Sequence, residues 1–340
     1  MGNTLTAPYK SVKKRPTYAE LPEPVQGYPS CADYFNSLQA ASSDGKDQLG
    51  TLNHLTKDRT AEAAKEILLG EGIALDAPLN LFAADSQAFG GRQPCRHQVL
   101  SVGEVGREDA LHFNTQASSQ WDGLRHFGIR AGKRWYNGVS AEELAASEIL
   151  GTQVWTERGG IVGRGVLVDF LSWAEGRGET VEVNTGRAIT LDDVLAILKH
   201  QKTTVKPGDV LLFRTGWLRW YRTTPQESRH NLLCIAHDPG THSFIGLAAH
   251  RDFLAWLWDN EISAVAADSV AFESTPPPET GGWLHDHLLG ALGMPIGELW
   301  NLEELAERCK EQKRFTFFLS STPLHVPGGV ASPANAVAIL

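Results

Sequence analysis

Hydrophobic positions follow the helical period in four stretches of the chain. Apolar residues recur every three or four positions in residues 60–72, 189–201, 248–262 and 302–312. This spacing places the apolar side chains on one face, so it predicts amphipathic helices packed against a core. Thr60 and Thr190 stand where helix N-caps are expected, and acidic residues follow Thr190 in the first turn.

Short apolar runs separated by Gly, Pro and charged residues predict the strands. These runs are residues 73–82, 97–105, 109–115, 163–170, 207–217, 263–272 and 314–325. Several are continuous rather than alternating, as expected of strands that are buried on both faces. Because the strands alternate with helices along the chain, the pattern favours an α/β fold over separate blocks of helices and strands.

The beginning of the chain differs from the rest. Residues 1–30 are rich in Pro, Lys and Tyr and have no clear period, so we expect an N-terminal arm over residues 1–46. No repeat, low-complexity tract or linker divides residues 47–340, which we expect to form a single domain. The start MGNTLT also fits a myristoylation pattern at Gly2, although such short patterns often arise by chance.

Composition and charge exclude several classes of protein. The chain is 42% hydrophobic and 21% charged, which is ordinary for a globular protein. Its formal net charge of −9 argues against a nucleic-acid partner, because such proteins carry a basic face. No window reaches the roughly 18 apolar residues of a membrane span, and no apolar leader is present. With four dispersed cysteines and no Cys-x-x-Cys pair, we expect a cytoplasmic protein with reduced thiols.

The densest group of residues with catalytic potential lies in residues 113–128, FNTQASSQWDGLRHFG. It contains Gln116, Gln120, Asp122 and His126. An Asp and a His four residues apart share one face if the segment is helical. Asp can bind a metal or orient an imidazole, and His can act as a general base near neutral pH. From spacing alone, a polar surface turn is an equally good interpretation.

The same stretch resembles the signature of the cyclase/kynurenine formamidase family, His-x-x-x-His-x-Asp-x-x-x-His. In that signature the first two histidines and the aspartate bind metal, and the last histidine is catalytic. Asp122 and His126 match it, whereas Gln116 and Gln120 replace the two metal-binding histidines. The resemblance runs from about Asp47 to the C-terminus, through the blocks DQLGTLNHLT, GIVGRGVLVD, PGDVLLFRTGW, LHDHLLGALGMPIGELWNLEEL and PLHVPGGVASPANAVAI.

The resemblance implies a fold and two further site residues. The fold is the swivelling β/β/α type, with a mixed β-barrel-like core, flanking helices and one catalytic domain. In the better-known branch, a second metal site uses the same Asp, a distant His and a later Glu. His285 and Glu298 correspond to these, with one extra residue between them that the break at residues 293–295 can absorb. His287 is a rival ligand.

Two glutamines in place of histidines change the expected metal chemistry. An amide oxygen is a neutral ligand that holds zinc far less firmly than an imidazole nitrogen. The resemblance therefore implies at most one divalent metal, manganese or zinc, and no other cofactor. The ligands of this metal ion would be Asp122, His285, Glu298 and Gln120. His126 would take the proton of the attacking water. In the metal-free alternative, Gln116 and Gln120 bind a substrate carbonyl or enol, and Asp122 orients His126.

Several neighbouring residues are candidates for contact with the substrate. They are Gln116, Gln120, Trp121 and Arg125. Trp121 could line an aromatic pocket or pack in the core, and Arg125 could clamp a carboxylate or form a surface salt bridge. His237 and His242 lie in a loop and have no evident partner, so they are left out of the catalytic set.

Three functions are consistent with these residues. The first is hydrolysis of an amide, lactam or lactone-type C–N or C–O bond in a small molecule, with His126 as general base. The alternative is a metal-independent carbon–oxygen lyase, dehydratase or cyclase in a secondary-metabolic pathway. The third is an inactive relative that acts as a binding protein. The resemblance further implies a homodimer or homotetramer.

Overall fold

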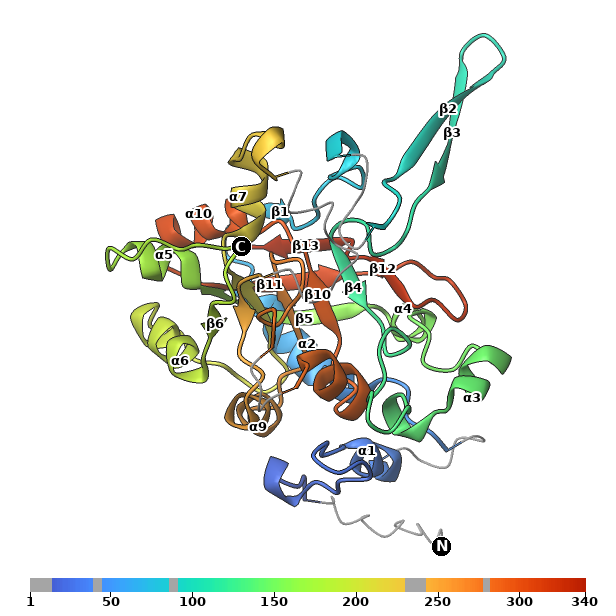
Figure 1. Cartoon of the computed structure of the whole chain (residues 1–340), viewed down its shortest axis with the longest axis vertical. Coiled ribbons are helices and arrows are strands. Elements are labelled where there is room, and N and C mark those ends of the chain that lie inside the picture. Colours follow the sequence, from blue (N-terminus) through green and yellow to red (C-terminus); the bar gives the residue numbers. More distant parts are fainter. Residues whose placement is uncertain (1–13, 39–44, 86–90, 230–242, 278–281) are drawn as a thin grey trace, which may run out of the picture.

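Nine strands form one mixed sheet that curls strongly into a half barrel, and helices flank it (Figure 1). The computed structural model describes residues 14–38, 45–85, 91–229, 243–277 and 282–340. The architecture confirms the predicted α/β class with a mixed, barrel-like core and flanking helices. The pattern at Gly2 and the loop residues His237 and His242 lie outside the described residues.

The order of the strands brings distant parts of the sequence together. From one edge to the other the strands are β1 (Gly72–Ala74), β13 (Ala336–Ile339), β11 (Thr316–Ser321), β5 (Ile161–Asp169), β7 (Val210–Arg214), β9 (Ala264–Ala267), β10 (Ile296–Glu298), β4 (Gln120–Asp122) and β12 (Ala331–Pro333). The central strands β5, β7, β9 and β10 run parallel. Every residue of β7 and β9 is buried, as expected of parallel strands covered on both faces.

The helices of the described residues include α1 (Ala32–Leu38), α2 (Lys57–Ala63), α3 (Ala141–Ala146), α4 (Gln153–Glu157), α5 (Phe170–Glu175), α6 (Leu191–His200), α7 (Trp217–Thr223), α9 (Arg251–Asp259), α10 (Glu303–Gln312) and the π-helix η7 (Asp286–Ala291). Three of the four predicted helices, α6, α9 and α10, form within their predicted ranges. The Thr190 side chain accepts a hydrogen bond from the Asp193 backbone nitrogen, so the predicted cap of α6 is confirmed.

The helix predicted over residues 60–72 is shorter and starts earlier. Thr56, not Thr60, caps α2, and the helix ends after seven residues. The apolar run that follows is not helical, because the backbone nitrogens of Leu69 and Gly70 donate to the carbonyl of Leu340 at 2.8 Å. The strand predicted from the next apolar run is likewise limited to the three residues of β1.

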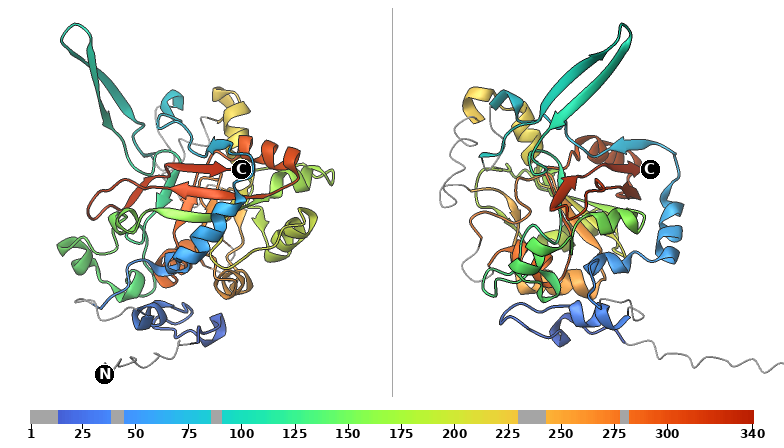
Figure 2. Two further views of the ribbon diagram at one scale, coloured as in Figure 1. Left: turned by 180° about the vertical axis from the view of Figure 1, so that it is seen from behind. Right: turned by 90° about the vertical axis from the view of Figure 1, so that its right-hand side faces the viewer.

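A two-stranded hairpin projects from the body of the molecule (Figures 1 and 2). It consists of β2 (Arg96–Val102) and β3 (Gly106–His112), which pair antiparallel. Its strands were predicted, but they lie outside the main sheet and are exposed along nearly their whole length. At the tip, Gly103 has φ +62°, a left-handed conformation that suits a tight turn. The two ends of the hairpin lead directly into the site described below.

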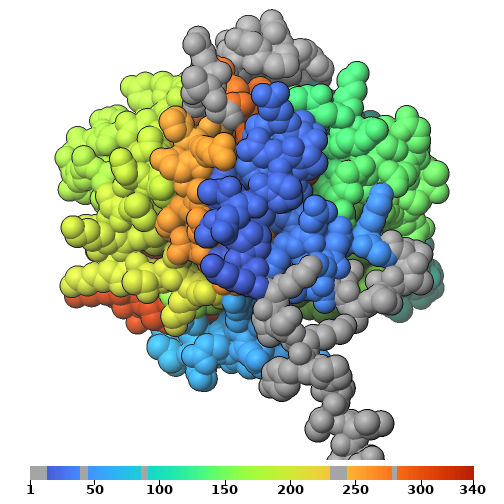
Figure 3. Space-filling view, turned by 90° about the horizontal axis from the view of Figure 1, so that it is seen from below, coloured from blue at the N-terminus to red at the C-terminus, as the bar shows by residue number. Residues whose placement is uncertain are grey.

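Residues 14–38 lie across the body beside α9 (Figure 3, where they are blue and α9 is orange). Arg15 donates to the carbonyl of Trp258 at 2.9 Å, and the Trp258 indole nitrogen donates to the carbonyl of Pro16 at 2.9 Å. Phe35 joins the hydrophobic core. This part of the predicted arm is therefore packed against α9. Among the described residues, no helix has the length and apolarity required to cross a membrane.

Candidate active site

Strand β4 sets the alternation of side chains on which the site depends. Gln120 and Asp122 project from one face of the strand and Trp121 from the other, because consecutive strand residues alternate. The neighbouring strand β10 places Glu298 directly opposite Gln120. All of these side chains are buried. The pairing of two three-residue strands thus gathers two carboxylates and an amide on one face of the sheet.

A tight turn after β4 returns His126 to Asp122. The backbone nitrogen of His126 donates to the carbonyl of Gly123 at 2.9 Å, and His126 Nε2 lies 3.9 Å from Asp122 Oδ1. A side chain at position 123 would bring its Cβ within 2.5 Å of the Val330 carbonyl oxygen, so the turn requires glycine. The segment is therefore a strand and a turn, not the helix that the four-residue spacing suggested.

His285 completes the cluster from the opposite side. It lies at the start of η7, and its Nδ1 is 2.7 Å from both carboxylate oxygens of Glu273. This contact turns Nε2 toward the β4 face, 3.6 Å from Asp122 Oδ2 and 3.3 Å from Glu298 Oε1. Carboxylate support of this kind fixes the tautomer and the orientation of a ligating histidine.

The side chains of Gln116 and Gln120 link the carboxylates of Asp122 and Glu298 by hydrogen bonds. Gln116 Nε2 donates to Asp122 Oδ1 at 2.5 Å, and Gln120 Nε2 donates to Glu298 Oε2 at 2.9 Å. Gln120 Nε2 also donates to Gln116 Oε1 at 2.7 Å. The amide nitrogens, rather than the amide oxygens, therefore face the acidic groups. Positions that hold metal-binding histidines in the resembled signature form an amide bridge here.

The two histidines differ in pKa because their electrostatic surroundings differ. Burial lowers the pKa of His126, and the charges of His285 and Arg92 lower it further despite Asp122. Burial opposes the charge of His285, but Glu273 and the other carboxylates outweigh it and raise its pKa well above the ordinary value. His126 is therefore the neutral imidazole of the site and can accept a proton. The negative charge of the surrounding carboxylates instead favours the protonated form of His285.

The carboxylates are divided in the same way. Burial works against ionisation of Asp122, yet the neighbouring imidazoles of His126 and His285, together with hydrogen bonds from His285 and Gln116, outweigh it and hold its pKa below the usual value. Burial, together with the charge of Asp122, raises the pKa of Glu298 to about 7. Two neighbouring carboxyl groups thus differ in their affinity for a proton, a feature that marks sites of acid–base chemistry.

A pocket of about 140 Å³ opens onto the cluster. Its lining residues are Arg92, Gln116, His126, Phe127, Arg130, Val270, Ala271, Glu273, Trp283, His285 and Glu298. The Arg130 guanidinium stacks on Phe127 at 4.7 Å and on Trp283 at 4.9 Å, both measured to the ring centroid. It also forms an ion pair with Asp286. The pocket therefore combines flat aromatic walls with two positive charges.

Two residues expected at the substrate do not line this pocket. Trp121 is fully buried on the opposite face, where its indole nitrogen donates to Ser321 Oγ at 2.9 Å and its ring packs edge-on against Trp300. Arg125 donates to the carbonyls of Ser147, Ile149 and Leu144. Strand alternation and these backbone contacts place both side chains outside the lining of this pocket. His287, the rival ligand, stacks on Tyr28 away from the cluster.

The donor set suits a divalent metal. One atom from each of Asp122, His126 and His285 lies within 4.8 Å of the others, so these residues can hold an ion. Asp122 Oδ2 is buried and accepts no hydrogen bond, which leaves it available as a ligand. Glu298 Oε1 is a further oxygen at the same place. Gln120 Oε1 also accepts no hydrogen bond, although the amide nitrogen is the atom that faces the carboxylates.

Several residues of the site were not predicted from the sequence. Glu273 and Arg92 belong to no motif, and Phe127 and Arg130 follow His126 without a spacing that marks them. Position in the sequence is the signal that could have identified Arg92. It precedes the hairpin strands and Gln116 follows them, so both residues lie at the base of the hairpin. Glu273 closely follows the buried strand β9, and α/β folds often place site residues after a strand.

Comparisons with known proteins agree with this geometry. The family model described as "Putative cyclase" matches residues 9–274. A crystal structure of a novel cyclase has a TM-score of 0.73 and 31% identity, covering 86% of this chain and 96% of that chain. Comparison with curated proteins gave no match.

More distant structures share the fold alone. Isatin hydrolase A from Ralstonia solanacearum has a TM-score of 0.57 and 14% identity, covering 79% of this chain and 91% of that one. An isatin hydrolase bound to the product analogue thioisatinate has a TM-score of 0.54 and 14% identity, covering 82% and 94%. The family match extends over most of the sequence and supports an enzymatic function. The chain belongs to the cyclase family.

Proposed function

We propose that the protein is a small-molecule hydrolase that cleaves an amide, lactam or lactone-type bond. The observation that carries the proposal is the position of neutral His126 beside buried Asp122, at the end of a pocket that also contains His285 and Glu298. A base that is accessible from the pocket can take a proton from a water molecule while that water attacks a carbonyl carbon. The likeness of the fold to isatin hydrolases supports this class of reaction.

The residues of the chain have separate roles in this reaction. Asp122, His285 and Glu298 would hold one divalent ion, manganese or zinc, and the ion would supply Lewis acidity that eases deprotonation of water. Glu273 keeps His285 Nε2 directed at the cluster. His126 accepts the proton from water and returns it to the leaving nitrogen or oxygen. The guanidinium groups of Arg92 and Arg130 stabilise negative charge on the oxygen of the attacked carbonyl and on the product carboxylate.

A second candidate is a metal-independent lyase, dehydratase or cyclase that uses the same His126 and Asp122. The amide bridge favours it, because Gln116 and Gln120 fix both carboxylates by hydrogen bonds. In this reaction His126 removes a proton from carbon and Glu298, whose pKa is raised to about 7, donates one to the leaving oxygen.

Metal analysis combined with a substrate panel separates the candidates. Purified protein is analysed for bound metal, and then assayed with isatin, a lactone and formanilide before and after chelation. We expect turnover that falls on chelation, recovers with manganese or zinc, and disappears in His126→Ala but not in the exposed control His325→Ala. Full activity after chelation would favour the lyase candidate. Failure of the metal-loaded protein on every substrate would leave the inactive binding protein as the better description.

A further inference from the structure

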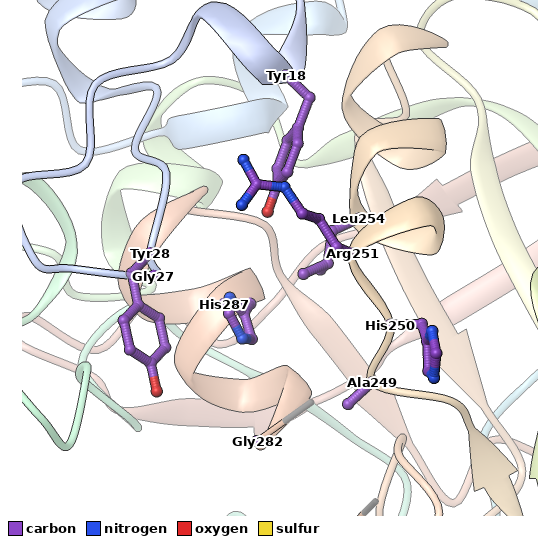
Figure 4. Close-up of a pocket in the computed structure, with 9 residues that line it drawn as sticks. All are labelled: Tyr18, Gly27, Tyr28, Ala249, His250, Arg251, Leu254, Gly282 and His287. Atoms are coloured by element: carbon purple, nitrogen blue, oxygen red, sulfur yellow. The ribbon is translucent and has the colours of Figure 1, made fainter. Parts of the chain in front are cut away.

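A second cavity, of about 400 Å³, shares no lining residue with the active-site pocket. Three parts of the chain enclose it: the segment that contains Tyr18 and Tyr28, the start of α9, and the stretch from Gly282 to His287 (Figure 4). Its volume is in the range of pockets that bind small molecules. None of the residues predicted from sequence to act on the substrate lies here.

The cavity presents basic side chains in a protein whose net charge is −9. Its described lining includes the guanidinium of Arg251 and the imidazoles of His250 and His287, and no acidic residue is among these described lining residues. The cavity also lies at the first turn of the nine-residue helix α9, where the helix dipole favours an anion. Glu23 is the nearest carboxylate partner of Arg251, at 3.5 Å, and this exposed pair contributes little.

Two acidic residues adjoin lining residues in the sequence: Asp286 pairs with Arg130, and Asp252 lies beside His250. The Asp252 carboxylate accepts a hydrogen bond from the backbone nitrogen of Phe253 at 2.7 Å, and its other contact is His250 Nδ1 at 3.9 Å. Arg251 is therefore the permanently charged group in the described lining, and its guanidinium favours an anionic ligand.

The walls of the cavity favour a flat ring. Tyr28 and His287 are stacked, with ring centroids 4.5 Å apart and planes 25° apart. Arg251 extends over the Tyr18 ring, with Cζ 5.7 Å from the centroid, and Leu254 adds a buried apolar surface. Burial raises the pKa of Tyr18 to about 12, so its hydroxyl stays protonated and can donate a hydrogen bond. In Figure 4 Arg251 and Tyr18 reach toward the same space from opposite sides.

We propose that this cavity binds a small aromatic carboxylate, with its carboxylate at Arg251 and Tyr18 and its ring beside Tyr28 and His287. Arg251 is free to form a charge-assisted, two-point contact with a carboxylate in place of its weak surface pair. The aromatic pair supplies stacking area at low entropic cost. The assignment does not depend on the reaction proposed for the active site.

Calorimetric titration of the full chain with benzoate tests the proposal. Benzamide serves as the neutral ring, and inorganic phosphate as the anion without a ring. We expect benzoate to bind, benzamide and phosphate to bind at least tenfold more weakly, and Arg251→Gln to weaken benzoate at least tenfold. Arg251→Lys should recover part of this loss. The exposed control Arg222→Gln should leave the affinity unchanged.

A variant of the other pocket separates the two sites. Arg92→Gln removes a guanidinium from the active-site pocket and leaves the Arg130–Asp286 pair intact, so benzoate affinity at the second cavity should not change in it. Tyr28→Ala should weaken benzoate about tenfold, and thermal unfolding without ligand verifies that each variant is folded. The proposal is overturned if Arg92→Gln, rather than Arg251→Gln, abolishes binding. It is also overturned if phosphate binds as tightly as benzoate, or if no benzoate binds.

Discussion

Glu273 contacts Nδ1 of His285 through both of its carboxylate oxygens, each at 2.7 Å. Both residues are buried, and the contact leaves Nε2 as the nitrogen of the His285 ring that is directed at Asp122 and Glu298. Glu273 thus controls the cluster without being part of the signature that identifies it. Its role can be separated from that of the ligands by substitution.

Glu273→Gln should weaken binding of manganese or zinc by about 10- to 100-fold, the usual loss when a supporting carboxylate of a ligating histidine is removed. The amide can still accept one hydrogen bond but carries no charge to support the imidazole. Titration calorimetry measures the change. Glu157→Gln is a matched control, because Glu157 contacts the exposed His325 at 3.4 Å. Equal metal affinity in wild type and Glu273→Gln would contradict the role assigned to Glu273.

His126→Ala should lower kcat by about 10²- to 10⁴-fold while leaving metal affinity nearly unchanged, because a general base contributes to the rate and not to binding of the ion. Steady-state kinetics and metal titration of the same protein preparation measure both. His126 also lies within reach of an ion shared with Asp122 and His285. Loss of metal binding in this variant would therefore make His126 a ligand, and another group would have to be the base.

The double variant Gln116→His, Gln120→His should bind one additional metal ion per chain. These positions lie beside Asp122, and imidazole nitrogens hold zinc more firmly than amides do. Elemental analysis after dialysis gives the stoichiometry, with exposed Gln226→His as the control for an added histidine. An unchanged metal content would mean that the surrounding backbone, and not only the two amides, prevents a second ion from binding.

Trp121→Phe should destabilise the protein by about 1–3 kcal/mol and leave KM unchanged. The substitution removes a hydrogen bond to Ser321 and part of a side chain that packs against Trp300 in the core. Urea unfolding gives the free energy, and kinetics on the best substrate of the panel gives KM. A several-fold rise in KM with unchanged stability would indicate that Trp121 does contact the substrate.

Asp268 should make stability depend on pH. Burial raises its pKa to about 6 in the folded protein, although Thr215 and Gly216 donate three hydrogen bonds to it. The folded state therefore holds this proton more tightly than the unfolded state does. As pH rises from about 4 through 6, wild type should lose about 3 kcal/mol relative to Asp268→Asn.

Urea unfolding of both proteins between pH 4 and 7 measures this difference. The hydrogen bond that Asn cannot accept gives a constant offset, so the change with pH is the informative quantity. Asp192→Asn, an exposed substitution in the first turn of α6, controls for removal of a charge. Parallel stability curves for wild type and Asp268→Asn would contradict the prediction.

Much of the fold could be predicted because its central strands and main helices carry their pattern locally. The apolar runs that became β5, β7 and β9, and the capped period of α6, needed no knowledge of distant residues. Strand β4 could not be found this way. Its three residues are largely polar, and it exists because β10 and β12 pair with it from far along the chain.

The candidate residues that could be grouped from the sequence are those in the contiguous motif or in a recognisable family block. Asp122, His126, His285 and Glu298 do come together in space. Glu273 and Arg92 could not be assigned, because no spacing in the sequence relates them to the motif. Trp121 adjoins Gln120 and Asp122 in the sequence but lies on the opposite face, because neighbouring residues of a strand alternate.

The alternation in β4 also limits how this site can change over evolutionary time. Adding or deleting one residue there would turn Gln120 and Asp122 into the core and push Trp121 into the cluster, so the length of this segment is fixed by the packing behind it. Exchanging one side chain for another at the same position carries no such cost. Histidine and glutamine at positions 116 and 120 differ only in the side chain, so exchanging one for the other changes the donor atoms beside Asp122 without shifting the register of the strand.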